Sequence, residues 1–171
     1  MDFGLLLLRL TVGFTLAAHG AQKLFGWFGG PGLDATGTGF EMIGFHPGRR
    51  YARMAGLVEA GAGLLLALGF FTPIAAAAVF AVMLVAGVSV HVKQGFFITS
   101  GGYEYTLVLG VAGLTFAFTG PGALSLDALL GYSLSGGTLA GVAALLVGLV
   151  GGAVQLAQRH AAPALQTADA K

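Results

Sequence analysis

The 171-residue sequence contains no cysteine, and only 9% of its residues are charged. Without cysteine the chain itself has no disulfide, no thiolate chemistry, no Cys-ligated zinc and no Cys-ligated iron–sulfur cluster. Soluble domains carry about 25% charged residues, so this chain has too few charges to cover a water-facing surface. The net charge is only +1, and no basic patch with interleaved aromatic residues is present, which argues against nucleic acid as a partner.

Apolar residues are what the sequence has in abundance, at 56% of the chain, and the mean hydropathy is +0.87. A membrane-spanning helix needs roughly 20 predominantly apolar residues. Five stretches reach or approach that length: 4–27, 51–70, 73–92, 103–119 and 138–158. They are apolar all round instead of alternating, which favours helices over a β-barrel. The sequence therefore predicts an all-α membrane protein, an antiparallel bundle of transmembrane helices in the lipid bilayer.

The connections and the N-terminus give further expectations. Residues 28–50 are rich in glycine and are expected to hold a short amphipathic helix around Asp34 to Ile43, and a second short helix is expected to begin at Ser125. The chain starts without the basic region of a secretory signal peptide and has Arg9 inside its first apolar run. We therefore expect the first segment to be retained.

The lysines and arginines predict how the bundle is oriented. With five spans, seven of the eight fall on one side, and only Arg9 falls on the other. Cytoplasmic loops carry the excess of Lys and Arg, so the N-terminus is predicted outside and the C-terminus inside. The seven residues on the inner side are Lys23, Arg49, Arg50, Arg53, Lys93, Arg159 and Lys171.

Polar residues from four of these helices are predicted to meet in one layer near the inner face. An ionisable group inside a bilayer costs at least about 2–3 kcal/mol and almost always faces the bundle interior or a wet cavity. His19 and Lys23 share a helix face because they are four residues apart, and Glu59 is expected to pair with one of them. The predicted ligand-binding or proton-active residues are His19, Gln22, Lys23, Glu59, His91, Tyr103 and Glu104.

Each of these residues also has a simpler explanation, so the predicted site depends on their convergence. Lys23 can snorkel to the interface, Glu104 can stabilise a helix N-terminus, and His19, Glu59 and His91 can be structural. His19, Glu59, His91 and Glu104 are of metal-ligating type, but no two of them have a diagnostic spacing, so no metal site is predicted. No catalytic residue is assigned either.

Two structural features are predicted outside this layer. Arg9 and Asp127 both lie near the outer face in this topology and are expected to form a bidentate ion pair. The last apolar stretch has small residues at successive fourth positions, a spacing that lets helices approach closely in lipid. This stripe is suited either to dock the helix on the bundle or to form a homo-oligomer. It consists of Ala140, Ala144, Gly148 and Gly152.

An ordered set of motifs resembles the DoxX family of small bacterial membrane proteins. The motifs are "HGAQKLFGWFGGPGL", the Glu of "AGLVEAGAGLLLALGFFTP", "HVKQGFFITSGGYEYTLVL" and "TGPGALSLD", which together cover about residues 4–131. The motif positions are Arg9, His19, Gln22, Lys23, Glu59, His91, Tyr103, Glu104 and Asp127. The resemblance implies a four-helix core over 4–131. The helix within 132–158 is then an addition, and 159–171 is expected to be a mobile polar tail.

The resemblance also implies a setting for the protein in the bacterial cytoplasmic membrane. DoxD-type subunits are associated with thiosulfate:quinone oxidoreductase, and other DoxX-like proteins are linked to redox and stress-defence enzymes. This favours a membrane subunit or anchor of a redox system, with redox protein partners and quinone as the expected small molecule. The chain has no cysteine, no flavin or nicotinamide fingerprint and no haem-ligand signature, so no activity is expected from it alone. Two alternatives stay open: a small-molecule or ion-coupled transporter built around Glu59, and a structural partner protein without a ligand.

Overall fold

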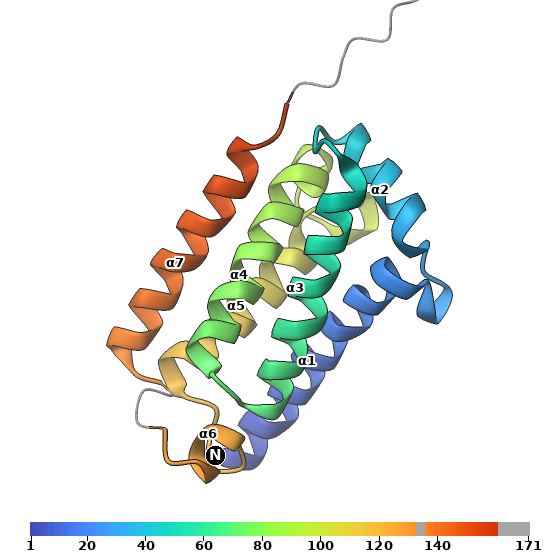
Figure 1. Cartoon of the computed structure of the whole chain (residues 1–171). Helices are drawn as coiled ribbons and strands as arrows, with labels where there is room; N and C mark the ends of the chain where they lie inside the picture. Colours follow the sequence, from blue (N-terminus) through green and yellow to red (C-terminus); the bar gives the residue numbers. More distant parts are fainter. Residues whose placement is uncertain (133–135, 161–171) are drawn as a thin grey trace, which may run out of the picture.

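The computed structural model of the protein describes residues 1–132 and 136–160, and within these ranges all the regular elements are helical (Figure 1). This confirms the predicted all-α membrane bundle. Short 3₁₀ turns and one π-helical turn connect or extend the α-helices. The α-helices, in chain order, are α1 (Asp2–Phe25), α2 (Gly32–Met42), α3 (Gly48–Leu68), α4 (Thr72–Ala86), α5 (Glu104–Thr119), α6 (Leu126–Leu129) and α7 (Thr138–Ala157).

Four helical segments in the described residues are long and apolar enough to cross a membrane. They are α1, α3, α4 with its extension to Gln94, and α7. Helix α5 is apolar but has only 16 residues, which at 1.5 Å per residue gives about 24 Å, less than the ~30 Å hydrocarbon core. It nevertheless packs along α4 and α7 inside the bundle. All five predicted apolar stretches are therefore helices of one bundle, and α5 is the shortest of them.

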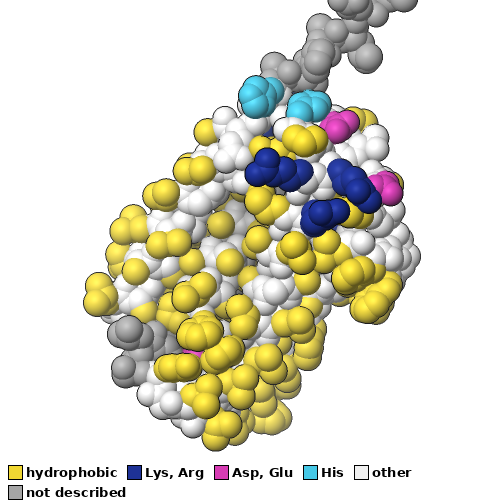
Figure 2. All heavy atoms as spheres, in the orientation of Figure 1, with side chains coloured by type: hydrophobic (Ala, Val, Ile, Leu, Met, Phe, Trp, Pro, Cys, Tyr) yellow, Lys and Arg dark blue, Asp and Glu magenta, His cyan; other side chains and the backbone are white. Residues whose placement is uncertain are grey.

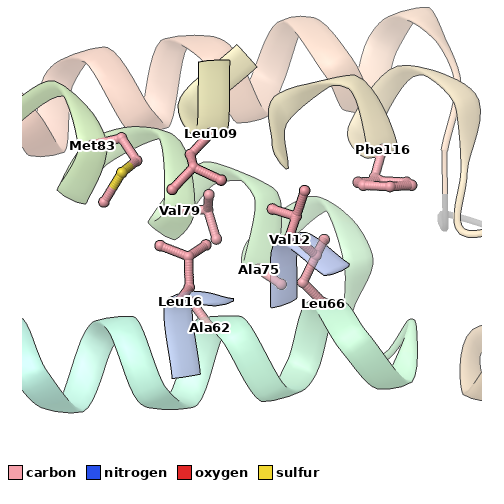
Figure 3. Close-up of a cluster of buried hydrophobic side chains, with 9 residues drawn as sticks. All are labelled: Val12, Leu16, Ala62, Leu66, Ala75, Val79, Met83, Leu109 and Phe116. Carbon is pink, nitrogen blue, oxygen red and sulfur yellow. The ribbon is translucent and has the colours of Figure 1, made fainter. Parts of the chain in front are cut away.

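Helix α4 lies at the centre of the bundle and packs against α3, α5 and α7. The main core joins α1, α3, α4 and α5, and Figure 3 shows its side chains converging around Val79, with Leu16 from α1 and Leu109 from α5. A second cluster, which includes Ala77 and Ala144, joins α4 and α5 to α7. The bundle is therefore one body in which α1 and α7 lie on opposite sides of α4 (Figure 1).

The most extensive helix contact is between α1 and α3, and glycine makes it possible. A Cβ placed on Gly63 would lie 2.5 Å from the carbonyl oxygen of Gly13, and a Cβ on Gly13 would lie 2.5 Å from the carbonyl oxygen of Gly63. Gly20 and Gly56 meet about two turns further along, where a Cβ on Gly20 would lie 2.6 Å from the carbonyl oxygen of Gly56. Small residues at such positions let helix backbones approach closely in lipid, where packing replaces the hydrophobic effect as the driving force for association.

The surface of the bundle divides into an apolar body and a charged end. Figure 2 shows apolar side chains over most of the visible face and Lys and Arg side chains gathered near α2. We call this region the basic end; there α1 ends, α3 begins, the α4 extension ends and α7 ends. Exposed Arg49, Arg50, Arg53 and Lys93 lie there, whereas Arg9 lies toward the opposite end. This division is typical of a multi-pass membrane protein.

The structure also contains the two short helices expected in the connections. Helix α2 lies within the predicted amphipathic region, and α6 begins directly after Ser125, whose Oγ accepts a hydrogen bond from the Ala128 amide at 3.2 Å. The first two residues of the predicted tail, Arg159 and His160, are described and contact the segment between α2 and α3. Residues 161–171 lie outside the described part of the chain.

The small-residue stripe of α7 packs inside the chain. Ala144, Gly148 and Gly152 are buried, and a Cβ on Gly148 or Gly152 would lie within 3.0 Å of α4 atoms. Of the two roles that the sequence left open, the structure therefore has the docking of α7 on α4. A homo-oligomer through Ala140, Ala144, Gly148 and Gly152, the other role, is not shown, and most of that stripe is covered within the monomer.

Candidate functional site

A cleft of about 480 Å³ lies between α3 and α7, with α4 as its floor. Small and branched apolar side chains form most of its wall, including Ala55 and Val58 from α3 and Val82 and Val85 from α4. Helix α7 packs on α4 and α5, so the cleft occupies the space that separates α7 from α3. Its volume falls in the usual range for small-molecule sites, about 300–1,000 Å³.

One pair of charged side chains borders this cleft. Lys23 Nζ donates a hydrogen bond to Glu59 Oε2 at 2.5 Å, and the two form an ion pair. The Glu59 side chain is only 4% exposed, whereas that of Lys23 is 24% exposed. The contact expected between α1 and α3 is thus present, and both residues line the cleft. A buried carboxylate is retained in an apolar site only when it is paired in this way.

The cleft is closed at the basic end by contacts between the end of α7 and the segment around the start of α3. The Tyr51 hydroxyl donates to Gln158 Oε1 at 2.9 Å. Arg159 Nε donates to the Ile43 carbonyl at 2.9 Å, and its guanidinium carbon lies 5.8 Å from the centre of the Phe45 ring. These contacts tie α7 to α3 at one end only, and the body of the cleft between the two helices remains unfilled.

His91 and Ser89 line the cleft from the end of α4. Here the regular helix changes at Gly87 into a π-helical turn that ends at His91. His91 Nδ1 donates to the Gly101 carbonyl at 2.7 Å, which ties this turn to the loop before α5. Ser89 Oγ is buried and has no hydrogen-bond partner within the described residues. Short π-helical segments often occur at functional sites.

His19 and Gln22 lie near the ion pair in sequence but not on the cleft wall. The His19 ring packs edge-on against Tyr105 of α5, with ring centroids 6.0 Å apart. Gln22 Nε2 donates weakly, at 3.4 Å, to the Phe28 carbonyl in the turn after α1. The three polar side chains of the "HGAQK" motif in α1 therefore contact three different residues, Tyr105, Phe28 and Glu59. Of the three, Lys23 lines the cleft.

Tyr103 and Glu104 hold the loop between α4 and α5 instead of joining the cleft. Glu104 Oε2 accepts a hydrogen bond from the Ile98 amide at 2.9 Å. The Tyr103 ring packs edge-on against Phe96 at 5.4 Å, and Tyr103 lines a separate shallow hollow between α4 and α5. The expectation that all seven polar residues meet in one layer is therefore corrected to a smaller group around Lys23, Glu59 and His91.

Arg9 and Asp127 are both buried at the opposite end of the bundle, but they bind different partners. Arg9 donates to three carbonyls, those of Ala67 at 2.9 Å, Leu124 at 2.5 Å and Pro121. Asp127 accepts from the Phe71 amide at 2.8 Å, and from the amide and the hydroxyl of Thr72 at 3.0 and 2.6 Å. The predicted bidentate pair is therefore wrong, because within the described residues Arg9 bonds to backbone carbonyls, Asp127 bonds to Phe71 and Thr72, and no ion pair joins the two.

These contacts make the opposite end a structural clamp. Arg9 ties α1 to the end of α3 and to the segment after α5, and Asp127 ties α6 to the start of α4. Gly69, at φ +63°, allows the close approach of this corner, since a Cβ there would lie 2.7 Å from Arg9 Nη1. The clamp fixes the helices that carry the cleft, and its charged groups are all occupied by protein partners.

The cleft also has lining residues that the sequence analysis did not single out. Tyr51, Ser89 and Gln155 contribute polar groups to its wall. Ser89 lies in "AGVSVHVK" two residues before His91, and a serine within an apolar span is the signal that could have identified it. The described residues hold no group of three or more His, Asp or Glu side chains arranged to bind a metal ion.

The comparisons with known proteins give one match. A family model described as DoxX matches residues 4–92, slightly more than half of the chain. Neither the curated proteins nor the solved structures include a significant match. The matched segment runs from α1 to the π-helical turn, so it contains Lys23, Glu59, Ser89 and His91. Helices α5, α6 and α7 lie outside it.

Proposed function

The chain belongs to the DoxX family of membrane proteins, and from this premise we propose that it is a membrane subunit or anchor of a redox or stress-defence system that binds a quinone in the cleft. The observation that carries the proposal is an apolar cleft of about 480 Å³, within helices suited to span a membrane, with an ion pair in its wall. Small-molecule sites are mostly apolar and have a few converging polar groups.

The shape and chemistry of the cleft suit an isoprenoid quinone. Such a molecule has a ring with two oxygen atoms and a long apolar tail. Val58, Val82 and Val85 supply an apolar surface for the tail. Lys23 and Ser89 supply hydrogen-bond donors for the ring oxygens, and His91 also lines this part of the cleft. The sequence contains no cysteine, so the chain itself has no thiol that could carry electrons. We propose that electrons come from a protein partner in the same membrane.

The unfilled space between α3 and α7 suggests how an apolar ligand would enter. In the described part of the chain, the hydrogen bond between Tyr51 and Gln158 links α3 to the end of α7 at the basic end. Entry from the bilayer between the two helices would let the ligand keep its tail in an apolar environment throughout. A transporter built around Glu59 would instead need an aqueous path from both sides of the membrane, and a purely structural partner would need no ligand at all.

The proposal is tested by titrating decylubiquinone into the protein in lipid nanodiscs. We expect saturable binding with one ligand per chain. Ala55→Trp adds a large side chain to the cleft wall and should weaken binding by at least about tenfold, which corresponds to 1.4 kcal/mol. The matched control is Ala153→Trp, on an exposed position of α7, which should bind like wild type.

Two outcomes of this titration would overturn the proposal. One is the absence of saturable binding in the folded wild-type protein. The other is equal affinity in the Ala55→Trp and Ala153→Trp variants, which would place the ligand elsewhere. Uptake of a polar solute into proteoliposomes without quinone binding would favour the transporter.

We also propose that the protein lies in a bacterial cytoplasmic membrane with its basic end in the cytoplasm. The clustering of Arg49, Arg50 and Arg53 at the start of α3 supports this orientation, because Lys and Arg are retained on the cytoplasmic side. The N-terminus and the C-terminal end of α7 lie at opposite ends of the bundle (Figure 1). A reporter fused after Lys171 should therefore give a cytoplasmic signal, and a periplasmic signal would reverse the orientation.

A further inference from the structure

Ser89 differs from the other hydroxyl side chains in the helices of this protein. The hydroxyls of Thr11, Thr115 and Thr119 donate to the carbonyl four residues earlier, at 2.9, 2.8 and 3.2 Å. This local bond satisfies a hydroxyl that has no other partner. Ser89 Oγ, by contrast, is buried without any partner among the described residues, and Ser89 lines the cleft. A buried hydroxyl without a hydrogen-bond partner carries an uncompensated desolvation cost, and a ligand that bonds to it offsets that cost.

His91 presents one defined ring nitrogen for an additional partner. Its Nδ1 lies 2.7 Å from the Gly101 carbonyl oxygen, and a carbonyl can only accept, so Nδ1 carries the proton of this bond. In the neutral ring, Nε2 is then a hydrogen-bond acceptor. Residues two apart in a regular α-helix do not face each other, yet Ser89 and His91, within the same π-helical turn, both line the cleft.

The hydrogen-bonding capacity of this part of the cleft defines the ligand group that it fits. Ser89 can donate and accept, and His91 Nε2 can accept. The Tyr51 hydroxyl, a further donor in the cleft wall, already bonds to Gln158. A ligand group that satisfies both Ser89 and His91 must therefore donate one hydrogen bond and accept another, and a hydroxyl does both.

We infer that Ser89 and His91 bind a hydroxyl of the ligand, so that the cleft prefers a hydroquinone to the corresponding quinone. This inference rests on the proposed function, because it concerns the same cleft. The two forms have almost the same size and the same tail, but the quinone oxygens only accept hydrogen bonds, whereas the hydroquinone oxygens donate as well. The quinone leaves His91 Nε2 without a donor, and the hydroquinone does not.

The inference is tested by comparing decylubiquinol, kept anaerobic, with decylubiquinone for binding to the protein in nanodiscs. Wild type should bind the reduced form about tenfold more tightly, the effect of one net hydrogen bond. His91→Asn should remove most of this preference and leave binding of the oxidised form within about twofold. Ser89→Ala loses the donor to the ligand oxygen in either form, so it should weaken both forms by a similar factor and keep the preference. Asparagine keeps a donor for the Gly101 carbonyl but has no counterpart of Nε2, so the loop contact is retained.

The control variant is Thr115→Val, which removes an exposed helical hydroxyl that already has a partner in Val111. It should retain the preference of wild type for the reduced form. Equal affinity of wild type for both forms would overturn the inference and leave the proposed function intact. An equal loss of affinity for both forms in His91→Asn would also overturn it, because His91 would then only shape the cleft. Unchanged binding of both forms in Ser89→Ala would show that Ser89 does not contact the ligand. Binding of neither form would overturn the inference and the proposed function together.

Discussion

Replacing Lys23 with methionine is expected to lower the free energy of unfolding by about 3 kcal/mol, within the range for removing one partner of a buried ion pair. The reason is that Glu59 is only 4% exposed and would keep its carboxylate among apolar side chains. Glu59→Gln should cost less, because Lys23 is 24% exposed and its flexible side chain can direct the ammonium toward water. Denaturation in mild detergent, followed by loss of helical signal, measures both effects.

The double variant tests whether Lys23 and Glu59 stabilise the protein as a pair or contribute to its free energy of unfolding independently. Combining Lys23→Met with Glu59→Gln removes both charges and should be more stable than Lys23→Met alone, since no unpaired charge remains. It should not regain ligand binding, because the cleft loses a charged pair from its wall. A double variant no more stable than Lys23→Met would show that the 2.5 Å contact contributes nothing. A double variant with normal binding would make the pair purely structural.

Gly63→Val is expected to prevent the native packing of α1 on α3. A side chain at Gly63 would meet the backbone of α1, with the Gly13 carbonyl oxygen 2.5 Å from the new Cβ. Backbone atoms of a packed helix cannot move aside as a flexible side chain can, so the two helices must separate. We expect a loss of at least about 3 kcal/mol, the upper end for overpacked cores, and most of the protein should elute as aggregate in size-exclusion chromatography.

The control for this variant lies two residues away on the same helix. Gly61 is exposed, and a Cβ there would meet nothing within 4 Å. Gly61→Val makes the same chemical change in the same helix and should leave the folded fraction near that of wild type. If both variants elute as folded protein, close contact between α1 and α3 is not required for the fold.

The helices and one key contact could be predicted from the sequence because they depend on local patterns. Long apolar stretches fix where helices can cross a membrane. Lys23 and Glu59 could be paired because charged residues in apolar spans must find partners inside the bundle. Because α1 and α3 are antiparallel, Lys23 near the end of α1 and Glu59 in α3 then lie at a similar depth in the membrane. These inferences require only spacing and the cost of isolated charge.

The contacts of Arg9, Asp127 and Glu104 could not be predicted because their partners are backbone groups in irregular segments. Arg9 binds carbonyls of Ala67 and Leu124, and Asp127 binds the amides of Phe71 and Thr72. A sequence pattern shows which side chains are charged but not where a loop places its free amides and carbonyls. Opposite charges at similar depth therefore suggested an ion pair where the protein uses two separate sets of hydrogen bonds.

The cleft itself could not be predicted either, because it depends on what is left unfilled between helices. Its existence follows from α7 packing on α4 and α5, while among the described residues a hydrogen bond from Tyr51 of α3 to Gln158 links the two helices at the basic end. The glycines of α7 predicted close packing but not which neighbour they would meet. Ser89 gave little signal, since a single serine in an apolar helix usually bonds to its own backbone, and only the structure shows that its hydroxyl has no partner.

We expect the cleft between α3, α4 and α7 to hold an apolar molecule with a polar ring. Native mass spectrometry of the protein purified from its membrane in mild detergent tests this directly. The folded chain should retain one non-covalent molecule with the mass of an isoprenoid quinone, and the Ala55→Trp variant, purified in the same way, should lack it. A wild-type spectrum with only the bare chain or ordinary phospholipids, or equal quinone retention by Ala55→Trp, would contradict the account.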